Sequence, residues 1–111
     1  MSETPLEIDC RAVKESLDSG DDLLILDCRE QDEYATAHIE QAKLIPMGEI
    51  PDRLRELESH RERRIVVHCH HGGRSRRVVR WLREQGFSQA QNLTGGIDQW
   101  SLEIDPSVPR Y

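Results

Sequence analysis

The sequence predicts an α/β fold in which a mostly parallel sheet of about five short strands lies between helical layers. Apolar runs of strand length alternate with segments whose apolar residues recur at helical spacing. The clearest runs, 23–26 and 65–67, are continuously apolar, which is typical of strands that are covered on both faces. With 111 residues and no linker or internal repeat, we expect one domain over 1–111, with its core at about 6–104 and an irregular tail at 105–111.

The first half of the chain begins with a helix that carries its own start signal. Asp9 suits the N-cap of this helix, and Ile8 can pack on Val13 as a hydrophobic staple. The elements that we expect after it are a strand at 23–26, a short helix at 31–37 and a short strand at 42–45.

The second half begins with a helix in which Ile50, Leu54 and Leu57 are spaced four and three residues apart. Pro51 is tolerated there because the first turn of a helix leaves its N–H groups unbonded. The elements expected after it are a strand at 65–68, a helix that begins near 73, a short strand at 90–93 and a helix from 97 to about 102.

A cysteine lies at the carboxyl end of the strand expected at 65–68, and a helical pattern starts four residues after Cys69. The loop between them must curl tightly, and Gly72 and Gly73 permit backbone angles that a side chain would forbid. Such a curl points backbone N–H groups inward, at the positive end of the following helix. Because a thiol in this position ionises more easily and the thiolate is the nucleophile, we predict a reactive Cys69 in an anion-holding cradle.

The sequence Asp27-Cys28-Arg29 ends another predicted strand. Ligands bind beyond the carboxyl ends of parallel strands, so these residues and Cys69 are expected at one edge of the sheet. Asp27 and Arg29 are expected to brace the cradle through an ion pair or backbone contacts. His38 is expected to make a structural hydrogen bond to a neighbouring loop, and Cys28 is favoured as a small buried filler over a resolving thiol.

The net charge is −6, yet basic residues are concentrated in one part of the chain. Between Arg53 and Arg83 lie ten arginines, opposed by three glutamates. A nucleic-acid interface is not expected, because the total charge is acidic and aromatic residues make up only 5% of the chain. Solvated helix faces account for most of these arginines; a local positive field that draws small anions to the cradle is the alternative.

Compartment and cofactors are inferred from what the sequence lacks. No stretch approaches the ~20 apolar residues of a membrane span, and residues 1–5 have neither the basic start nor the apolar middle of a signal peptide. We therefore expect a cytoplasmic protein without membrane contact and without a cofactor. Three cysteines, an odd number, argue against a disulfide framework, and Cys10 is expected to be an ordinary position in the first helical turn.

With these residues in view, the chain resembles a single-domain rhodanese, a thiosulfate sulfurtransferase-like protein. Residues 27–42 are similar to the family's first signature, D-x-R, E, then G-H-I-x-G-A, although Ala37 and Gln41 replace its two usual glycines. That departure alters one turn without touching the expected chemistry. Residues 93–100 resemble the closing signature. The resemblance covers about 8–100 and implies a rhodanese-like three-layer α/β/α fold.

The resemblance also implies a sulfurtransferase that carries sulfur as a Cys69 persulfide. The Cys69 thiolate would take the outer sulfur of thiosulfate or a persulfide donor and pass it to cyanide or a thiol acceptor, and a sulfur-relay protein is a further expected partner. Inward N–H groups would stabilise both anionic forms. Arg74 would either bind the anionic part of the donor or shape the loop through a salt bridge. The expected loop residues are His70, His71, Gly72, Gly73, Arg74 and Ser75.

Loop length argues against a phosphatase. Related phosphatases carry five residues between the cysteine and the arginine, whereas only four separate Cys69 from Arg74. A ring that is one residue shorter suits a sulfur atom better than a tetrahedral phosphate.

No metal site is expected, because four consecutive residues at a tight turn, 68–71, cannot all converge on one tetrahedral ion and no second Cys/His pair exists. His70 and His71 are instead expected at the rim, where they gain positive charge as the pH falls toward ~6.5 and below. The alternative to an enzyme is a sulfur-carrier or regulatory binding module on the same fold, in which Cys69 carries or senses sulfur for a protein partner without turnover.

Overall fold

The computed structural model describes residues 4–111, so residues 1–3 of the predicted domain, which are part of the stretch inspected for a signal peptide, lie outside the described residues. Five parallel strands form one sheet in the order β1-β5-β4-β2-β3, which confirms the predicted α/β fold. The strands are β1 (Glu7–Ile8), β2 (Leu23–Asp27), β3 (Lys43–Leu44), β4 (Arg64–His68) and β5 (Ala90–Leu93).

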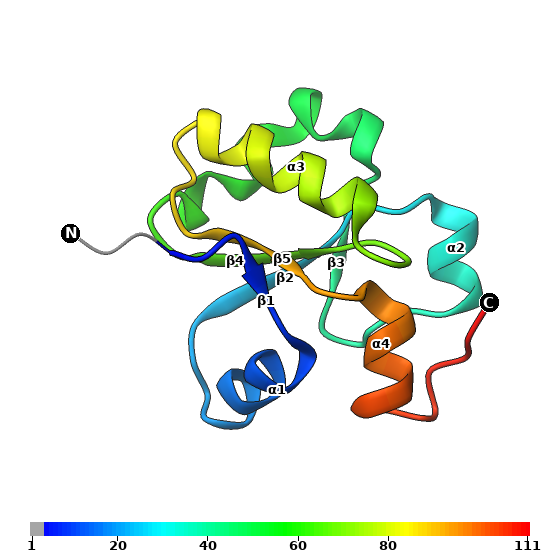
Figure 1. Cartoon of the computed structure of the whole chain (residues 1–111). Helices are drawn as coiled ribbons and strands as arrows, with labels where there is room; N and C mark the ends of the chain where they lie inside the picture. Colours follow the sequence, from blue (N-terminus) through cyan, green and yellow to red (C-terminus); the bar gives the residue numbers. More distant parts are fainter. Residues whose placement is uncertain (1–3) are drawn as a thin grey trace.

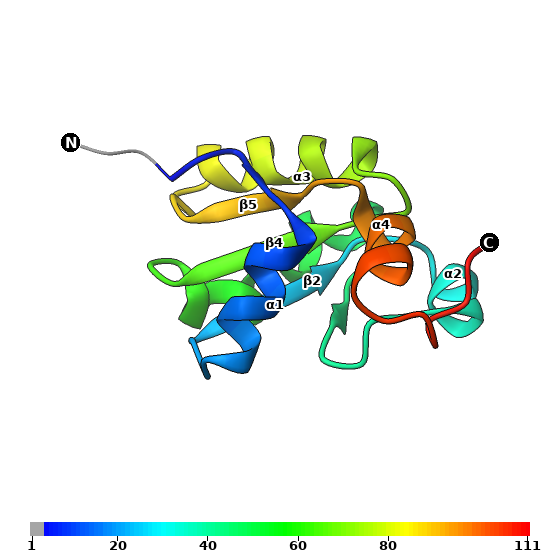
Figure 2. The same cartoon turned by 60° about the horizontal axis from the view of Figure 1, so that its bottom comes forward.

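Helices cover both faces of the sheet (Figure 1). The helix α3 and the 3-10 segments lie over one face, α1 and α4 lie over the other, and α2 lies near the end of the chain in both views (Figure 2). No helix in 4–111 combines the length and the apolar character that a membrane crossing requires. The helical elements are α1 (Cys10–Asp18), α2 (Gln31–Thr36), η1 (Met47–Glu49), η2 (Pro51–His60), α3 (Gly73–Glu84) and α4 (Gly96–Glu103).

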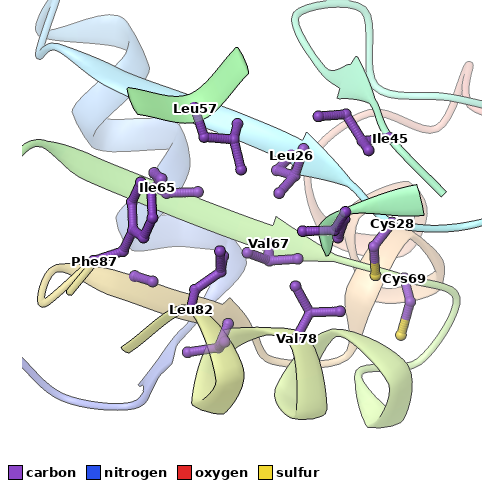
Figure 3. Packing of buried hydrophobic residues seen from close by; sticks show 13 residues of the cluster. Leu26, Cys28, Ile45, Leu57, Ile65, Val67, Cys69, Val78, Leu82 and Phe87 are labelled. Carbon is purple, nitrogen blue, oxygen red and sulfur yellow. The ribbon is translucent and has the colours of Figure 1, made fainter. Parts of the chain in front are cut away.

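The central strands are apolar throughout because each of their faces packs against helices. Successive side chains of a strand point to opposite faces. Ile65 and Val67 of β4 therefore enter the cluster under α3, which Figure 3 shows, whereas Val66 enters the cluster under α1 and α4. Cys69, immediately after β4, belongs to the α3 cluster. The core thus anchors the strand that delivers the cysteine.

The first helix begins as predicted, but a strand precedes it. Asp9 is the N-cap of α1, and its Oδ1 accepts a hydrogen bond of 2.8 Å from the N–H of Ala12. Ile8 packs against the cluster that contains Val13. Glu7 and Ile8 also pair with β5 as β1, which the sequence did not predict because two residues are too few to show a periodic pattern.

The predicted helix after Ile50 is a 3-10 helix with a break, not a regular α-helix. Its backbone is non-helical at Arg53, where φ is −115° and ψ is 16°. The N–H of Arg53 bonds to the carbonyl of Ile50 three residues earlier, and Pro51 has no N–H to offer a longer bond. The apolar face was predicted correctly, since Ile50 and Leu57 are buried.

Candidate active site

The carboxyl end of β4 delivers Cys69 into the turn that starts α3. Cys69 Sγ accepts hydrogen bonds from the N–H of Gly72 at 3.1 Å, the N–H of Ser75 at 3.4 Å and the Oγ–H of Ser75 at 3.3 Å. The side chain is only 2% exposed, but the surrounding amides point at the sulfur instead of away from it. This arrangement has the geometry of the cradle expected from the sequence.

The cradle changes the acidity of the thiol. Burial opposes ionisation of Cys69, but the hydrogen bonds from Ser75 Oγ and from the N–H groups of Ser75, Gly72 and Arg74 outweigh it, so the pKa of Cys69 lies below its ordinary value. The positive end of α3 acts in the same direction. The thiolate population at neutral pH is therefore raised.

Only one of the two loop glycines is needed for its backbone freedom. Gly72 has a φ of 116°, which residues with a side chain rarely adopt, although a Cβ there would make only ordinary contacts, the nearest with Asn92 Nδ2 at 3.5 Å. Gly73 has no positive φ, and a Cβ there would meet no atom within 4 Å. The expectation for Gly73 was wrong because this residue already belongs to α3 and adopts ordinary helical geometry.

A second glycine contact closes the loop from the side of α4. The N–H groups of Ile97 and Asp98 donate to the carbonyls of Cys69 and His70 at 2.9 and 3.1 Å. A Cβ on Gly96 would lie 2.5 Å from the Cys69 carbonyl oxygen, so only glycine allows this approach. The first turn of α4, which starts at Gly96, thus holds the backbone of the cradle.

Asn92 on β5 forms hydrogen bonds with residues of the cradle and was not identified from the sequence. Its Oδ1 accepts a hydrogen bond from Ser75 Oγ, and its Nδ2 donates to the Gly72 carbonyl at 3.2 Å and to Glu7 Oε1 at 3.0 Å. The sequence offered one signal for this role, a side-chain amide within a strand whose residues are all buried. A buried polar group needs hydrogen-bond partners, so such an amide indicates a polar network nearby.

Arg74 is held by α2. Its guanidinium donates to both carboxylate oxygens of Glu33, at 2.7 and 2.8 Å. Hydrogen bonding to Arg74 is the main reason that the pKa of Glu33 falls to about 2. Of the two roles expected for Arg74, the geometry matches the salt bridge that shapes the loop. Glu33 belongs to the first signature, but its place beside the cradle was not foreseen.

Asp27 and Arg29 form the ion pair that was expected to brace this edge. The pair is fully buried, with contacts of 2.9 and 2.7 Å, and Arg29 Nη2 also donates to the carbonyl of Ala37 at 2.7 Å. His38 is exposed, and its Nδ1 lies 3.0 Å from the carbonyl of Tyr34, one turn back along its own segment. The expected bond from His38 to a neighbouring loop was therefore wrong, because the end of α2 offers a nearer free carbonyl.

The tail brings Tyr111 to the cradle's rim. Its hydroxyl donates to Glu33 Oε2 at 2.8 Å and accepts from Arg29 Nη1 at 2.7 Å. Its ring stacks on His70 with centroids 4.0 Å apart. Figures 1 and 2 both show this end of the chain beside α2. No periodicity or motif marked Tyr111, so the sequence could not predict this contact.

The two rim histidines come together with Asp98. The atoms of His70, His71 and Asp98 that could bind a metal ion lie within 4.8 Å of one another. Residues 68–71 were not expected to converge on one ion, but two of them do come together with a carboxylate that is distant in the sequence. Arg110 already binds the Asp98 carboxylate at 2.9 Å, however. Burial, and then His71, lower the pKa of His70, so His70 gains its charge at a lower pH than expected.

Comparison with known proteins decides the family. The family model of the rhodanese-like domain matches residues 9–103, which include the cradle, the Asp27–Arg29 pair and the start of α4. The chain belongs to the rhodanese-like family. Rhodanese-like sequences and structures also match it nearly end to end.

The chain is 38% identical to the putative sulfurtransferase YtwF of Bacillus subtilis over 100 residues, which cover 90% of this chain and 94% of YtwF. It is 40% identical to the putative sulfur carrier protein YrkF of the same organism over 95 residues, 86% of this chain and half of YrkF. Of two other curated relatives, the adenylyltransferase and sulfurtransferase proteins MOCS3-1 and MOCS3-2 of Zea mays, it spans only 23%. The crystal structure of a rhodanese-like domain protein from Staphylococcus aureus has a TM-score of 0.81 and 31% identity, and the match covers 96% of this chain and 99% of that one.

The other two cysteines of this rhodanese-like domain lie in the core. Cys28 is fully buried and its thiol donates to the His68 carbonyl at 3.4 Å. Burial, with the nearby Cys69, raises the pKa of Cys28 above its ordinary range. Burial raises the pKa of Cys10 to about 12. Both thiols stay protonated at neutral pH, which fits the filler role expected for Cys28 and the ordinary role expected for Cys10.

Proposed function

We propose that this rhodanese is a sulfurtransferase that moves a sulfane sulfur through a Cys69 persulfide. The donor is thiosulfate or a persulfide, and the acceptor is cyanide or a thiol, either free or carried by a sulfur-relay protein. The proposal rests on one observation above others: three hydrogen bonds from two residues converge on Cys69 Sγ. Sulfurtransferase and sulfur-carrier relatives support it.

The first step is attack of the Cys69 thiolate on the outer sulfur of thiosulfate. One S–S bond forms, the bond between the two sulfurs of thiosulfate breaks, and sulfite leaves with its electron pair. In the second step cyanide attacks the outer sulfur, thiocyanate leaves and the electron pair returns to Cys69. Sulfur is anionic at both ends of this cycle, so the same N–H groups stabilise each resting form.

The donor in this proposal reaches the sulfur without help from a free arginine. Arg74 is engaged by Glu33 through two bonds, so binding a donor's anionic group would require that pair to open. We therefore assign Arg74, with Asp27, Arg29 and Glu33, to positioning of the cradle. The rim histidines His70 and His71 complete the loop but carry no bond to Cys69 Sγ. The reducing cytoplasm remains the expected setting, because the reaction needs a free thiol.

Intact mass after thiosulfate treatment tests the intermediate. The wild type should gain about one sulfur atom, and Cys69→Ser should gain none. Cys28→Ser is the matched control: it removes a different thiol and should still gain the sulfur. Steady-state thiosulfate:cyanide turnover should follow the same pattern, and turnover that survives in Cys69→Ser would refute the proposed nucleophile.

A non-turnover sulfur-carrier module is the second candidate, favoured by the likeness to the putative sulfur carrier YrkF. It predicts no turnover with any small donor, but sulfur on Cys69 after mixing with a persulfide-loaded protein. Measurable thiosulfate:cyanide turnover would remove this candidate.

A further inference from the structure

Two histidines of the loop and one carboxylate of α4 form a cluster at the rim of the cradle. Each of His70, His71 and Asp98 offers one atom that could bind a metal ion, and these atoms lie within 4.8 Å of one another. Among residues 4–111, no other group of three or more His, Cys, Asp and Glu side chains comes together in this way. We call these three residues the rim cluster.

The backbone brings the members of the rim cluster together. The N–H of Asp98 donates to the His70 carbonyl at 3.1 Å, and the N–H of Ile97 donates to the Cys69 carbonyl at 2.9 Å. These bonds hold the first turn of α4 against the loop that precedes α3, and the two lie side by side in Figures 1 and 2. The Asp98 carboxylate is therefore kept beside the two imidazole rings.

His70 has a ring nitrogen to offer to a ligand. Its ring lies between two others, stacked on Tyr111 with centroids 4.0 Å apart and on His71 with centroids 3.9 Å apart. The Nε2 atom of His70 is shielded from solvent and has no hydrogen-bond partner in residues 4–111. Buried polar atoms are normally bonded, and the nitrogen of a neutral imidazole is the commonest metal ligand in proteins. This nitrogen therefore points to a ligand at the rim.

His71 is able to close on the same point. Its side chain is 68% exposed, and its Nε2 lies 3.8 Å from Asp98 Oδ2. Ligand atoms around a tetrahedral zinc ion lie about 3.3 Å apart, since each is about 2.0 Å from the metal. The spread of 4.8 Å in the rim cluster must then shrink by about 1.5 Å, which rotation of the exposed His71 ring can supply.

We propose that the rim cluster binds a zinc ion, with His70, His71 and Asp98 as its three protein ligands. Zinc accepts imidazole nitrogen and carboxylate oxygen, and three protein ligands leave its fourth position to water. Cys69 is not a ligand in this site, because its sulfur points into the cradle, where Ser75 bonds to it. The ion ties the rim of the loop to α4, and its binding does not depend on the proposed sulfur transfer.

Arg110 competes with the ion for Asp98. Its guanidinium donates to Asp98 Oδ1 at 2.9 Å and to Oδ2 at 3.4 Å. The Arg110 side chain is 56% exposed, so this ion pair is weak and a divalent cation can displace it. Removal of Arg110 should therefore tighten zinc binding, an effect that casual binding to a surface histidine would not show.

Isothermal titration calorimetry of the reduced protein with zinc chloride tests the site. The wild type should bind one ion. His71→Asn and Asp98→Asn each remove a ligand and should weaken binding at least about ten-fold, since even the groups that orient metal ligands are worth that much. Arg110→Gln should tighten binding about two- to five-fold, because the competing ion pair is gone. His71 is exposed, so its variant stays informative even where Asp98→Asn disturbs the start of α4.

Two further variants are controls. His38→Asn removes an exposed histidine that also stacks on an aromatic ring, that of Tyr34, but lies outside the rim cluster. Cys69→Ser removes a reactive thiol, which is itself a zinc ligand when ionised. Both variants should bind zinc as the wild type does. With Co²⁺ as the probe, the absorption spectrum of the wild type should lack a sulfur-to-metal charge-transfer band.

Several results would overturn the zinc site. The wild type could show no saturable binding, or His71→Asn and Asp98→Asn could bind zinc as tightly as the wild type. Binding that disappears in Cys69→Ser, with a charge-transfer band in the cobalt spectrum, would assign the ion to the thiolate. An affinity that Arg110→Gln leaves unchanged or weakens would exclude Asp98 as a ligand.

Discussion

At the scale of single residues, the acidity of Cys69 depends chiefly on Ser75. Ser75 supplies two of the three hydrogen bonds to Cys69 Sγ, one from its N–H and one from its hydroxyl. Asn92 Oδ1 accepts from the same hydroxyl, so the single Ser75 Oγ proton is shared between Cys69 Sγ and Asn92 Oδ1. Burial alone would make this thiol inert, so these bonds separate Cys69 from the unreactive Cys28 and Cys10.

Ser75→Ala removes the hydroxyl bond and keeps the backbone bond. The pKa of Cys69 should rise, because a charge-assisted bond to the thiolate is lost while burial is unchanged. Alkylation of Cys69 by iodoacetamide near neutral pH should then slow about five- to ten-fold. Ser59→Ala, the same change at an exposed serine, should alkylate like the wild type. Equal rates in Ser75→Ala and wild type would contradict this account.

At the scale of elements, hydrogen bonds from several elements hold the loop in place. The start of α4 bonds to the carbonyls of Cys69 and His70, β5 supports Gly72 through Asn92, and α2 holds Arg74 through Glu33. The tail adds Tyr111, which shares Glu33 with Arg74. Glu33 therefore joins α2, α3 and the tail at one carboxylate.

Glu33→Gln should change how stability responds to acid. The pKa of Glu33 is about 2 in the folded chain and near 4.5 when unfolded, so its stabilisation is complete above pH 4.5 and is lost as the pH falls from there toward 2. The variant should lose about 1 kcal/mol at neutral pH, since Glu33 and Arg74 keep some contact with solvent, and should show a shallower fall below pH 4.5.

Urea unfolding at several pH values measures this difference. Glu40→Gln is the control, because Glu40 is exposed and pairs with no basic group in residues 4–111. Curves for Glu33→Gln and wild type that stay parallel between pH 5 and pH 2 would show that the Glu33 carboxylate contributes no linkage.

The sequence predicted the elements with strong local patterns and missed the contacts that lack them. The strand before Cys69 and the Asp27–Arg29 pair follow from apolar runs and from adjacency in the chain. Asn92 and Tyr111 are brought to the cradle only by tertiary folding, and neither has a periodic neighbour to mark it. The 3-10 geometry after Ile50 escaped for a similar reason, because apolar spacings of four and three fit both helix types within one or two turns.

At the scale of the whole molecule, most of the concentrated basic charge is neutralised locally. Six of the ten arginines between Arg53 and Arg83 bind carboxylates in the described part of the chain. This pairing favours solvated helix faces over one broad positive field as the explanation of these arginines. The six paired residues are Arg53, Arg61, Arg63, Arg64, Arg74 and Arg76.

The buried pair of Asp27 and Arg29 connects the parts of the molecule that surround the site. Asp27 ends β2, and Arg29 reaches from it to the Ala37 carbonyl after α2 and to Tyr111 in the tail. Neither side chain of the pair is exposed. A charge in such a place depends on its partner, because water cannot replace the lost interaction.

Asp27→Asn should therefore cost about 3–5 kcal/mol of unfolding free energy, since it leaves the Arg29 charge buried without a counter-charge. Arg29→Lys, which keeps the charge but loses the forked geometry, should cost less and still fold. Asp22→Asn is the matched control: it breaks the exposed pair with Arg63, 3.4 Å apart, and should cost at most about 0.5 kcal/mol. Urea unfolding monitored by tryptophan fluorescence measures all three losses. If Asp27→Asn unfolded at the same urea concentration as Asp22→Asn, the buried pair would contribute no more stability than an exposed pair, and its role in bracing the cradle would be refuted.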